Sequence, residues 1–398
     1  MPLILWSLFR AATSIDIGAA CGDPGYDFYG YGLCVSGSIN HFRADPEHPH
    51  RRRQMTMITA GMRVIEWAFI QNHLTRISED VPQLSIKDTN DVDLNAVASG
   101  DVVPEKSPRE HYPTVWGALW NACDLSFNLR GHGWNWAQSW YFPPETRPTS
   151  STSAFLASTL VSAIKNLLLF DLILSIIRSF SPSTVGSVAG GTIHNPSLPP
   201  YRRYAQSTFI TRAADVGVCA AMQAGYDILT IICIPILQQR PTQWPPLFDS
   251  PWLSTSLTDC WGRRWHQIFR GSFIGIGARP FSFLIGRVGG VMGAFFWSAI
   301  LHDFGMWGMG RGTEFWSVGG FFLLMGVGCV LEASFKKVTG LKVGGWLGWL
   351  WTVIWMAVWG NLMVDAWARR GLFGSKFMPD GYMPFQVLLS YIHRQLST

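Results

Sequence analysis

The feature that most constrains this chain is a series of long stretches without a charged residue. Residues 346–364 carry no charge, and residues 318–331 form a second uncharged stretch. A chain of 398 residues can also bury many apolar residues in a soluble core, so their distribution along the chain decides. Crossing a bilayer as a helix takes about 20 mostly apolar residues, and these stretches approach that length. The pattern predicts an integral membrane protein.

Composition and charge support this prediction and narrow the partners. Charged residues make up 14% of the chain, against roughly 25% in soluble domains. The 20 tryptophans fit a protein with membrane interfaces. The net charge of +5 arises from short basic clusters between apolar segments, as in cytosolic loops of membrane proteins. No coherent basic surface for nucleic acid and no Cys or His spacing for a metal is present, so the predicted partner is the lipid bilayer.

The predicted fold is an all-α, multi-pass transmembrane helix bundle with about five to eight spans. Residues 1–112 form an N-terminal region with a possible membrane helix at 55–72 and a polar, acidic loop at 79–110. Residues 113–375 form the membrane-embedded core, and residues 376–398 a C-terminal tail. The core spans are expected at about 154–178, 207–237, 280–301, 304–332 and 346–367.

Two features inside the expected spans indicate specific packing. Arg212, Asp215 and Asp227 lie in the second span, where charges are costly and face protein or a cavity. They either line an internal pocket, or the span begins after Asp215. Four glycines at three- and four-residue spacing fit close helix contact in lipid; they are Gly286, Gly289, Gly290 and Gly293.

A first candidate site segment is Trp261-Gly-Arg-Arg-Trp-His266, which follows a Pro-rich stretch. On a helix starting near Thr258 or Asp259, one face would carry Trp261, Trp265, Ile268 and Phe269, and the other Arg263 and Arg264. Such a helix would lie at the membrane surface. Composition alone favours an interfacial anchor.

A second candidate segment is Ser298-Ala-Ile-Leu-His-Asp303, at the end of a long apolar run. A histidine at membrane depth faces a cavity or a partner, and His302 is either such a residue or a core histidine bonded to a backbone carbonyl. Neutral imidazole is the side chain best suited to act as a base near pH 7.

Together these segments resemble the wax synthase-like branch of the membrane-bound O-acyltransferases, which includes fungal enzymes that acetylate terpenoid alcohols. The resemblance covers about residues 110–370. It rests on Pro-Leu-Phe-x-Ser-Pro followed by Trp261–His266, on the His302 motif about 36 residues further on, and on Arg130-Gly-His-Gly-Trp-Asn135.

The resemblance implies a set of site residues. His302 would be the general base, with Asp303 and Ser298 in support. His266 stands where many members have asparagine, and it would orient the acceptor or stabilise the oxyanion. Acyl-CoA, a co-substrate rather than a permanent cofactor, would be bound by Arg263 and Arg264 together with Trp261 and Trp265. We interpret His132 as structural.

The resemblance also implies a reaction. We expect transfer of acetyl from acetyl-CoA to a hydrophobic alcohol, such as a terpenoid or meroterpenoid of secondary metabolism, by an enzyme of the endoplasmic reticulum. A long-chain wax- or sterol-ester synthase is the alternative. A transporter or non-catalytic scaffold is a third, in which Arg212, Asp215 and Asp227 would mark a solute path. The chain shows no repeated halves of the kind that many transporters have.

The N-terminal region contains fewer clear spans than this resemblance implies. Residues 1–9 are apolar but lack the basic start of a signal peptide and are too short to span a bilayer. We therefore expect the chain to be short at its start.

Overall fold

The computed structural model describes residues 61–66, 74–76, 115–377 and 383–396. The expected acidic loop and most of the N-terminal region lie outside these ranges. Of the possible membrane helix at 55–72, only residues 61–66 are described, and they are helical. Arg63 and Glu66 of this turn form a buried ion pair at 3.1 Å, and the Ser272 hydroxyl donates to Glu66 at 3.0 Å. The turn is therefore attached to the core.

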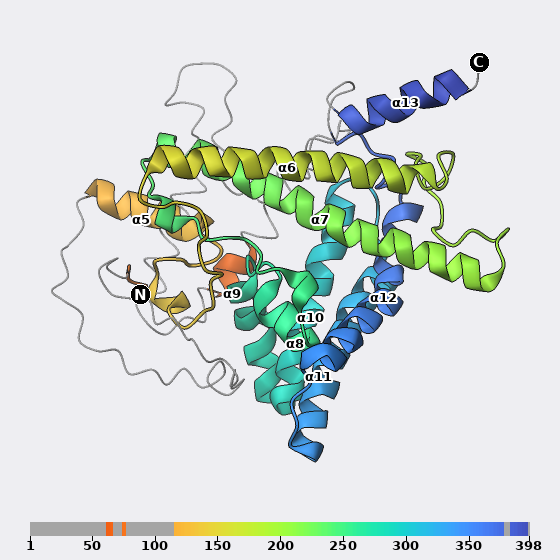
Figure 1. Ribbon diagram of the computed structural model, residues 1–398. Coiled ribbons are helices and arrows are strands. Elements are labelled where there is room, and N and C mark those ends of the chain that lie inside the picture. The colour runs from red at the N-terminus through yellow and green to blue at the C-terminus, as the bar shows by residue number, and fades with distance from the viewer. Residues whose placement is uncertain (1–60, 67–73, 77–114, 378–382, 397–398) are drawn as a thin grey trace. The chain divides into compact units, whose positions relative to one another are not determined.

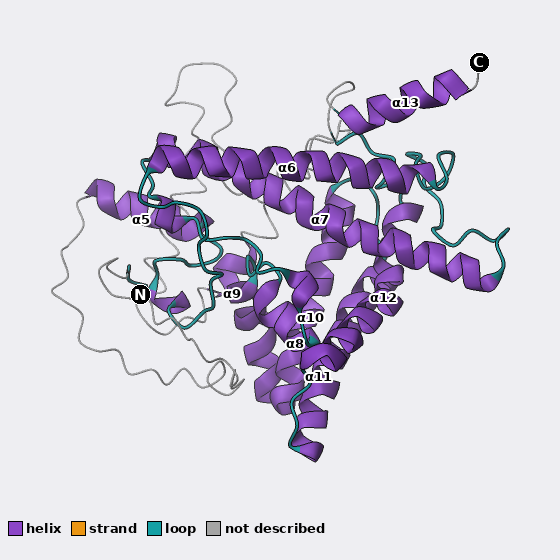
Figure 2. Cartoon of the chain, viewed as in Figure 1, coloured by secondary structure: helices purple, strands orange, loops and turns teal. Residues whose placement is uncertain are grey.

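The described ranges contain helices and loops but no strand (Figure 2). Five helical segments are long and apolar enough to cross a membrane, which confirms the predicted all-α, multi-pass fold. In Figure 1, α6 lies along α7, while α10, α11 and α12 pack together. The five segments are α6 (Thr152–Ser179), α7 (Pro200–Leu237), Arg270–Gly308 with α10 (Arg279–Gly308), α11 (Phe315–Thr339) and α12 (Gly345–Arg369).

Shorter elements connect these segments or lie beside them. Helix α5 (Val115–Phe127) precedes the core, and α13 (Pro384–Leu396) packs against α6. The region between α7 and α10 is built of short pieces. They are η4 (Pro241–Gln243), η5 (Pro251–Leu253), α8 (Leu257–Asp259), the π-helix η6 (Cys260–Arg264), α9 (Arg270–Ser272) and the π-helix η7 (Phe273–Ala278); η3 (Asn135–Ala137) lies earlier in the chain.

Two expected boundaries were wrong. Helix α7 begins at Pro200, before the expected start at 207 and well before Asp215; proline is favoured in the first helical turn, where its missing N–H costs nothing. The expected span at 304–332 is interrupted, because α10 continues to Gly308 and α11 begins at Phe315. Gly310 and Gly312 of the connection have φ values of 73° and 74°, a left-handed conformation that glycine adopts readily and that ends helices.

The segment Arg270–Gly308 is a helical hairpin rather than one straight helix. Gly286 has φ 70° and ψ −157°, outside the helical region. The rings of Phe281 and Phe296 lie 6.1 Å apart, although fifteen residues of a straight helix would separate them by about 22 Å. The first arm, residues 273–285, is about 20 Å long, too short to cross a bilayer alone.

The glycines of the hairpin allow its two arms to touch, as their spacing predicted. A Cβ atom on Gly293 would lie 2.6 Å from the carbonyl oxygen of Gly277, and one on Gly289 would lie 2.3 Å from that of Phe281. Backbone therefore meets backbone between the arms, in the manner of small-residue contacts between membrane helices.

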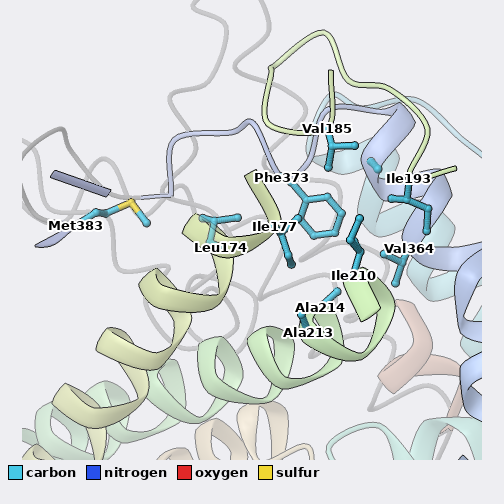
Figure 3. Packing of buried hydrophobic residues seen from close by; sticks show 11 residues of the cluster. Leu174, Ile177, Val185, Ile193, Ile210, Ala213, Ala214, Val364, Phe373 and Met383 are labelled. Carbon is cyan, nitrogen blue, oxygen red and sulfur yellow. The ribbon is translucent and has the colours of Figure 1, made fainter. Parts of the chain in front are cut away.

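One apolar core lies where the end of α6, the start of α7 and the end of α12 meet (Figure 3). The Arg178 side chain donates to the carbonyl oxygens of Phe373 and Ser375, both at 2.7 Å, which fixes the segment after α12 against α6. The buried members of this cluster are Leu174, Ile177, Val185, Ile193, Ile210, Ala213, Ala214, Val364, Ala368, Phe373 and Met383.

We expect Gly293→Ala to destabilise the protein by about 1–3 kcal/mol, the usual cost of overpacking, because its Cβ would meet the Gly277 carbonyl. The melting temperature in detergent, followed by tryptophan fluorescence, measures this. Gly344→Ala is the matched control, since a Cβ there meets nothing within 4 Å. Equal shifts in the two variants would contradict the hairpin contact.

Candidate functional site

Arg130 connects the Arg130–Asn135 motif to the Pro-rich stretch that precedes Trp261. This buried side chain donates from Nη1 to the carbonyl oxygen of Pro245 and from Nη2 to that of Pro246, both at 2.9 Å. The Tyr226 hydroxyl donates to the Pro245 carbonyl at 2.7 Å. A guanidinium with its donors in a fixed fork suits such a two-carbonyl contact. Arg130 thus fixes the start of the irregular segment 241–269.

The backbone conformation on either side of His132 explains why both neighbours are glycines. Gly131 and Gly133 adopt φ values of 67° and 80°, which side-chain-bearing residues rarely adopt. A Cβ on Gly131 would also lie 2.5 Å from the Trp136 ring. The His132 ring packs edge-on against Phe142, in agreement with a structural part.

The Trp261–His266 segment does not form the single interfacial helix that we predicted. Helix α8 begins after Ser256, whose hydroxyl accepts from the Asp259 N–H at 2.9 Å, and it passes into the π-helix η6. Trp265 then takes an extended conformation with ψ 152°. The wide turn closes with a bond from the Trp265 N–H to the Cys260 carbonyl at 2.8 Å. Ile268 and Phe269 therefore do not continue one helical face.

A buried carboxylate of α11 holds the start of this segment. Glu332 accepts from the backbone N–H groups of Leu257 at 2.6 Å and Thr258 at 3.0 Å, and from the Thr258 hydroxyl at 2.7 Å. The Trp351 indole donates to it at 3.0 Å. One turn earlier, Gly328 leaves room for the Leu257 side chain. A carboxylate at free N–H groups of a helix start is favourable, so Glu332 fixes η6 against α11.

Trp261 and Trp265 belong to an aromatic cluster inside the protein. The two rings lie 5.6 Å apart, and the Trp265 ring also lies 5.6 Å from His266. The contacts of Trp261 connect η6 with α10 and α11, and both tryptophan side chains are half-buried. The other partners are Phe295, Phe321 and Phe322 for Trp261, and Phe248 for Trp265.

Arg263 and Arg264 both have carboxylate partners. Arg264 donates from Nε to Asp259 at 2.6 Å and from Nη1 to the Asp249 carbonyl at 3.0 Å, which folds the segment onto itself. Arg263 lies 3.5 Å from the Asp249 carboxylate and stacks over Tyr141 at 4.4 Å. The Arg263 side chain remains 36% exposed, against 19% for Arg264, so Arg263 has the more accessible guanidinium.

The contact of His302 fixes its tautomer. Its Nδ1 lies 2.7 Å from the carbonyl oxygen of Ser298, one turn earlier in α10. A carbonyl only accepts, so Nδ1 carries the proton and Nε2 of the neutral ring keeps its lone pair. The ring packs over Phe322 with centroids 4.2 Å apart. Ser298 thus supports His302 through its backbone, as predicted for a histidine bonded to a backbone carbonyl. The alternative, that His302 faces a cavity, stays a prediction.

Asp303 serves the helix connection rather than His302. Its Oδ1 accepts from the backbone N–H of Glu314 at 2.7 Å, at the start of α11. Of the two parts considered for Asp303, orienting the imidazole or closing a helix end, the structure shows the second.

His266 is neutral at physiological pH. Burial, together with smaller contributions from the Arg130 charge and from a protonated His302, lowers its pKa to about 3. A series of ring contacts connects His266 with His302, through Trp265, Trp261 and Phe322. Nδ1 of His266 is buried without a hydrogen-bond partner in the described part of the chain, so this ring has capacity for a bound molecule.

The charged residues of α7 lie in two different environments. Arg212 and Asp215 pair with each other at 2.5 Å, and Arg212 also donates to the Met356 carbonyl at 2.9 Å. Asp227 instead lines a polar cavity of about 300 Å³ between α6 and α7. This cavity is half open at the protein surface, so the predicted internal pocket stays a prediction.

Comparison with known proteins shows a likeness to one family. Residues 244–324, which contain both histidine segments, match the model of the membrane bound O-acyl transferase family. The matched residues cover the irregular segment, the hairpin and the start of α11.

The chain is also similar to fungal and plant proteins. An acetyltransferase of Hericium erinaceus, eriL, is 23% identical over 75% of the chain and 77% of its own length. Acetyltransferase ple2 of Rhodocybe pseudopiperita is 26% identical over 57% of the chain and 60% of its own length. The probable long-chain-alcohol O-fatty-acyltransferase 8 of Arabidopsis thaliana is 32% identical over 30% of the chain and 38% of its own length. The last two matches cover less than two thirds of those proteins.

Sequence reasoning missed Glu332 and the partners of Arg130. Glu332 directly follows the uncharged stretch 318–331, and a lone acid at the edge of an apolar helix indicates a buried partner. That signal was present, but it does not name Leu257 and Thr258 as the partners.

The pKa of His266 predicts how stability depends on pH. A free imidazole titrates near pH 6.5 and His266 near 3, so the unfolded chain takes up this proton first as the pH falls. We expect the free energy of unfolding to drop below pH 6.5 by up to roughly 1.4 kcal/mol per pH unit. His266→Asn removes this effect, and its melting temperature should fall less between pH 7.5 and 5 than that of the wild type. Parallel losses would show that His266 is not buried.

Glu332→Gln should lower kcat by tenfold or more, because the amide group places a donor against the Leu257 and Thr258 N–H groups and releases η6. The control is Asp171→Asn, which changes another buried carboxylate of a spanning helix, one that accepts from Phe385 N–H at 2.8 Å far from η6 in the chain. Acyl transfer per folded protein is the measurement. Equal activity losses in the two variants would reduce Glu332 to a general stability role.

Proposed function

We propose that this chain transfers an acyl group from acyl-CoA to the hydroxyl of a hydrophobic acceptor, with His302 as the general base. The observation that carries the proposal is the bond from His302 Nδ1–H to the Ser298 carbonyl at 2.7 Å. It leaves Nε2 as a proton acceptor, in the same cluster of aromatic rings as His266, which stays neutral. General-base catalysis of this kind contributes roughly 10²–10⁴-fold to rate.

We propose that the acyl group passes directly from CoA to the acceptor hydroxyl. His302 Nε2 takes the proton of the acceptor hydroxyl while its oxygen attacks the thioester carbonyl carbon. The tetrahedral intermediate expels the CoA thiolate, which receives the proton from the His302 imidazolium, so that the products are an ester and free CoA. Neutral His266 has one N–H to donate to the developing oxyanion, a contact that stabilises the transition state more than the ground state.

The cysteine of the signature segment is unsuited to form an acyl-enzyme. Cys260 is buried, and burial raises the pKa of its thiol to about 12. The thiolate, not the thiol, is the nucleophile, so Cys260 stays unreactive at physiological pH. This supports direct transfer to the acceptor without an acyl-enzyme intermediate.

We propose that Arg263, rather than Arg264, contacts the phosphates of CoA. Guanidinium matches phosphate geometry, and Arg263 is the more exposed of the two, with its carboxylate partner at 3.5 Å. Arg264 is engaged at 2.6 Å by Asp259. Trp261 and Trp265 would shape the site through packing.

Acetyl-CoA is the donor that we propose, with a terpenoid-like alcohol as the acceptor and the endoplasmic reticulum as the location. The support is that the two fungal relatives, which match more than half of the chain, are named acetyltransferases. A long-chain acyl donor is the second candidate, since the plant relatives named O-fatty-acyltransferases reach 32–33% identity over a shorter stretch. The transporter reading loses part of its support, because Arg212 and Asp215 pair with each other.

The test is acyl transfer in membranes that contain the chain, with labelled acetyl-CoA or palmitoyl-CoA and a panel of terpenoid and fatty alcohols. We expect ester from acetyl-CoA, and a loss of at least about 100-fold in His302→Ala. His266→Asn should keep more activity than His266→Ala, because the amide retains an N–H donor in a similar place. Activity of His302→Ala equal to the wild type would contradict the proposed base, and ester from palmitoyl-CoA alone would select the second candidate.

A further inference from the structure

The segment around η6 contains one arginine more than it has carboxylates to pair with. The stretch from Asp249 to Arg270 carries two aspartates and three arginines. Asp259 accepts from Arg264 at 2.6 Å, and Asp249 lies 3.5 Å from Arg263. No carboxylate of the described residues lies within ion-pair distance of Arg270. The positive charge of Arg270 is therefore not neutralised within the segment.

Two acceptors hold one end of the Arg270 guanidinium. Its Nη1 donates to the Gly262 carbonyl at 2.6 Å and to Oε1 of Gln267 at 2.9 Å. Gln267 is buried, and its Nε2 donates to the carbonyl oxygens of Trp261 at 3.0 Å and Trp265 at 2.7 Å. The π-turn of η6 thus sets the position of the guanidinium.

The other edge of this guanidinium makes no hydrogen bond. Nε of Arg270 is buried without a partner in the described part of the chain, and Nη2 bonds to no described residue. A planar guanidinium presents its donors as a fixed fork that matches two oxygens of one phosphate. Arg270 is half-buried, so part of the side chain stays open to a ligand. A donor kept from water without an acceptor is costly, and a bound oxyanion would remove that cost.

Arg270 and Arg263 stack on neighbouring aromatic rings. The Arg263 guanidinium lies 4.4 Å from the centre of the Tyr141 ring, and that of Arg270 lies 5.8 Å from the Trp140 ring. Arg270 also bonds to the carbonyl of Gly262, the residue before Arg263. Consecutive residues in two segments therefore hold both guanidiniums in one neighbourhood. CoA carries a diphosphate and a further phosphate on its ribose, so one CoA molecule offers phosphates to two arginines.

The position of Arg270 in the hairpin fits a donor site. Arg270 is the first residue of the candidate span Arg270–Gly308, where the chain enters the apolar part of the protein. Phe269 packs against the buried cluster that contains Leu301, the residue before His302. A phosphate at Arg270 would therefore lie at the end of the hairpin that carries the proposed base.

We propose that Arg270 binds a phosphate group of CoA beside Arg263 and is a further binding residue for the donor. This inference rests on the proposed function. Nε and Nη2 of Arg270 would donate to phosphate oxygens, while Gln267 and the Gly262 carbonyl hold Nη1 on η6. Arg270 thus favours a CoA thioester over a thioester without phosphates, and it takes no part in proton transfer.

Binding of CoA tests the inference without turnover. We expect the purified full chain to bind CoA, with Kd measured by isothermal titration calorimetry. Arg270→Met should raise this Kd roughly tenfold or more, the effect of one charge-assisted hydrogen bond. Arg279→Met, a change at an exposed arginine of the same hairpin arm, is the control and should keep the wild-type Kd. Equal affinity in Arg270→Met and the wild type would overturn the inference and leave acyl transfer standing. A wild-type chain that binds no CoA would overturn both.

A donor without phosphates separates a ligand contact from a structural role. Arg270→Met also removes the bonds to Gly262 and Gln267, and loss of that support would slow transfer from every donor. Loss of a phosphate contact affects only donors that carry phosphate. We expect kcat/KM for acetyl-CoA to fall roughly tenfold in Arg270→Met, and kcat/KM for acetylpantetheine to change less than about twofold. Arg270→Lys, which keeps the charge, should restore part of the loss for acetyl-CoA. Equal losses with the two donors would overturn the inference.

Discussion

The site depends on how an irregular segment satisfies its polar groups inside a membrane protein. Hydrocarbon offers no hydrogen-bond partners, so non-helical backbone is tolerated there only where protein or a cavity supplies them. Residues 241–269 connect two candidate membrane spans with short helical pieces and loops, so their buried backbone groups need partners within the protein. At one end, Arg130 donates hydrogen bonds to two proline carbonyls. Further along, Glu332 accepts hydrogen bonds from two backbone N–H groups and a hydroxyl. Both anchors come from other parts of the chain, which is why distant motifs converge on one place.

These anchors bring together two histidines with different environments. His302 lies on a regular helix, and its tautomer is set by the carbonyl one turn before it. His266 follows the point where the chain leaves the π-helix, and burial keeps it neutral. One ring thus has a fixed proton acceptor, and the other has capacity to orient or stabilise a bound group. These two roles require residues 241–269 to stay packed against α10 and α11.

The sequence predicted the spans more fully than the contacts. Long apolar stretches indicate membrane insertion because charge is costly in lipid, and they located all five candidate segments. An apolar stretch does not show whether the chain runs straight or turns back, so the hairpin at Gly286 was not predicted. For the same reason the loop at Gly310, between α10 and α11, was not predicted. The motif resemblance selected both histidines. Helical periodicity wrongly extended the Trp265 helix, since a π-turn leaves no periodic signal, and the choice of Glu332 as its anchor follows from tertiary packing alone.

The most direct measurement is a double-mutant cycle in kcat for His266→Ala and His302→Ala, with each variant checked for folding. Residues that act as one unit on a bound substrate show strongly non-additive losses. The account predicts that the double variant loses little more activity than His302→Ala alone. Losses that multiply would contradict a single site built from the two imidazoles.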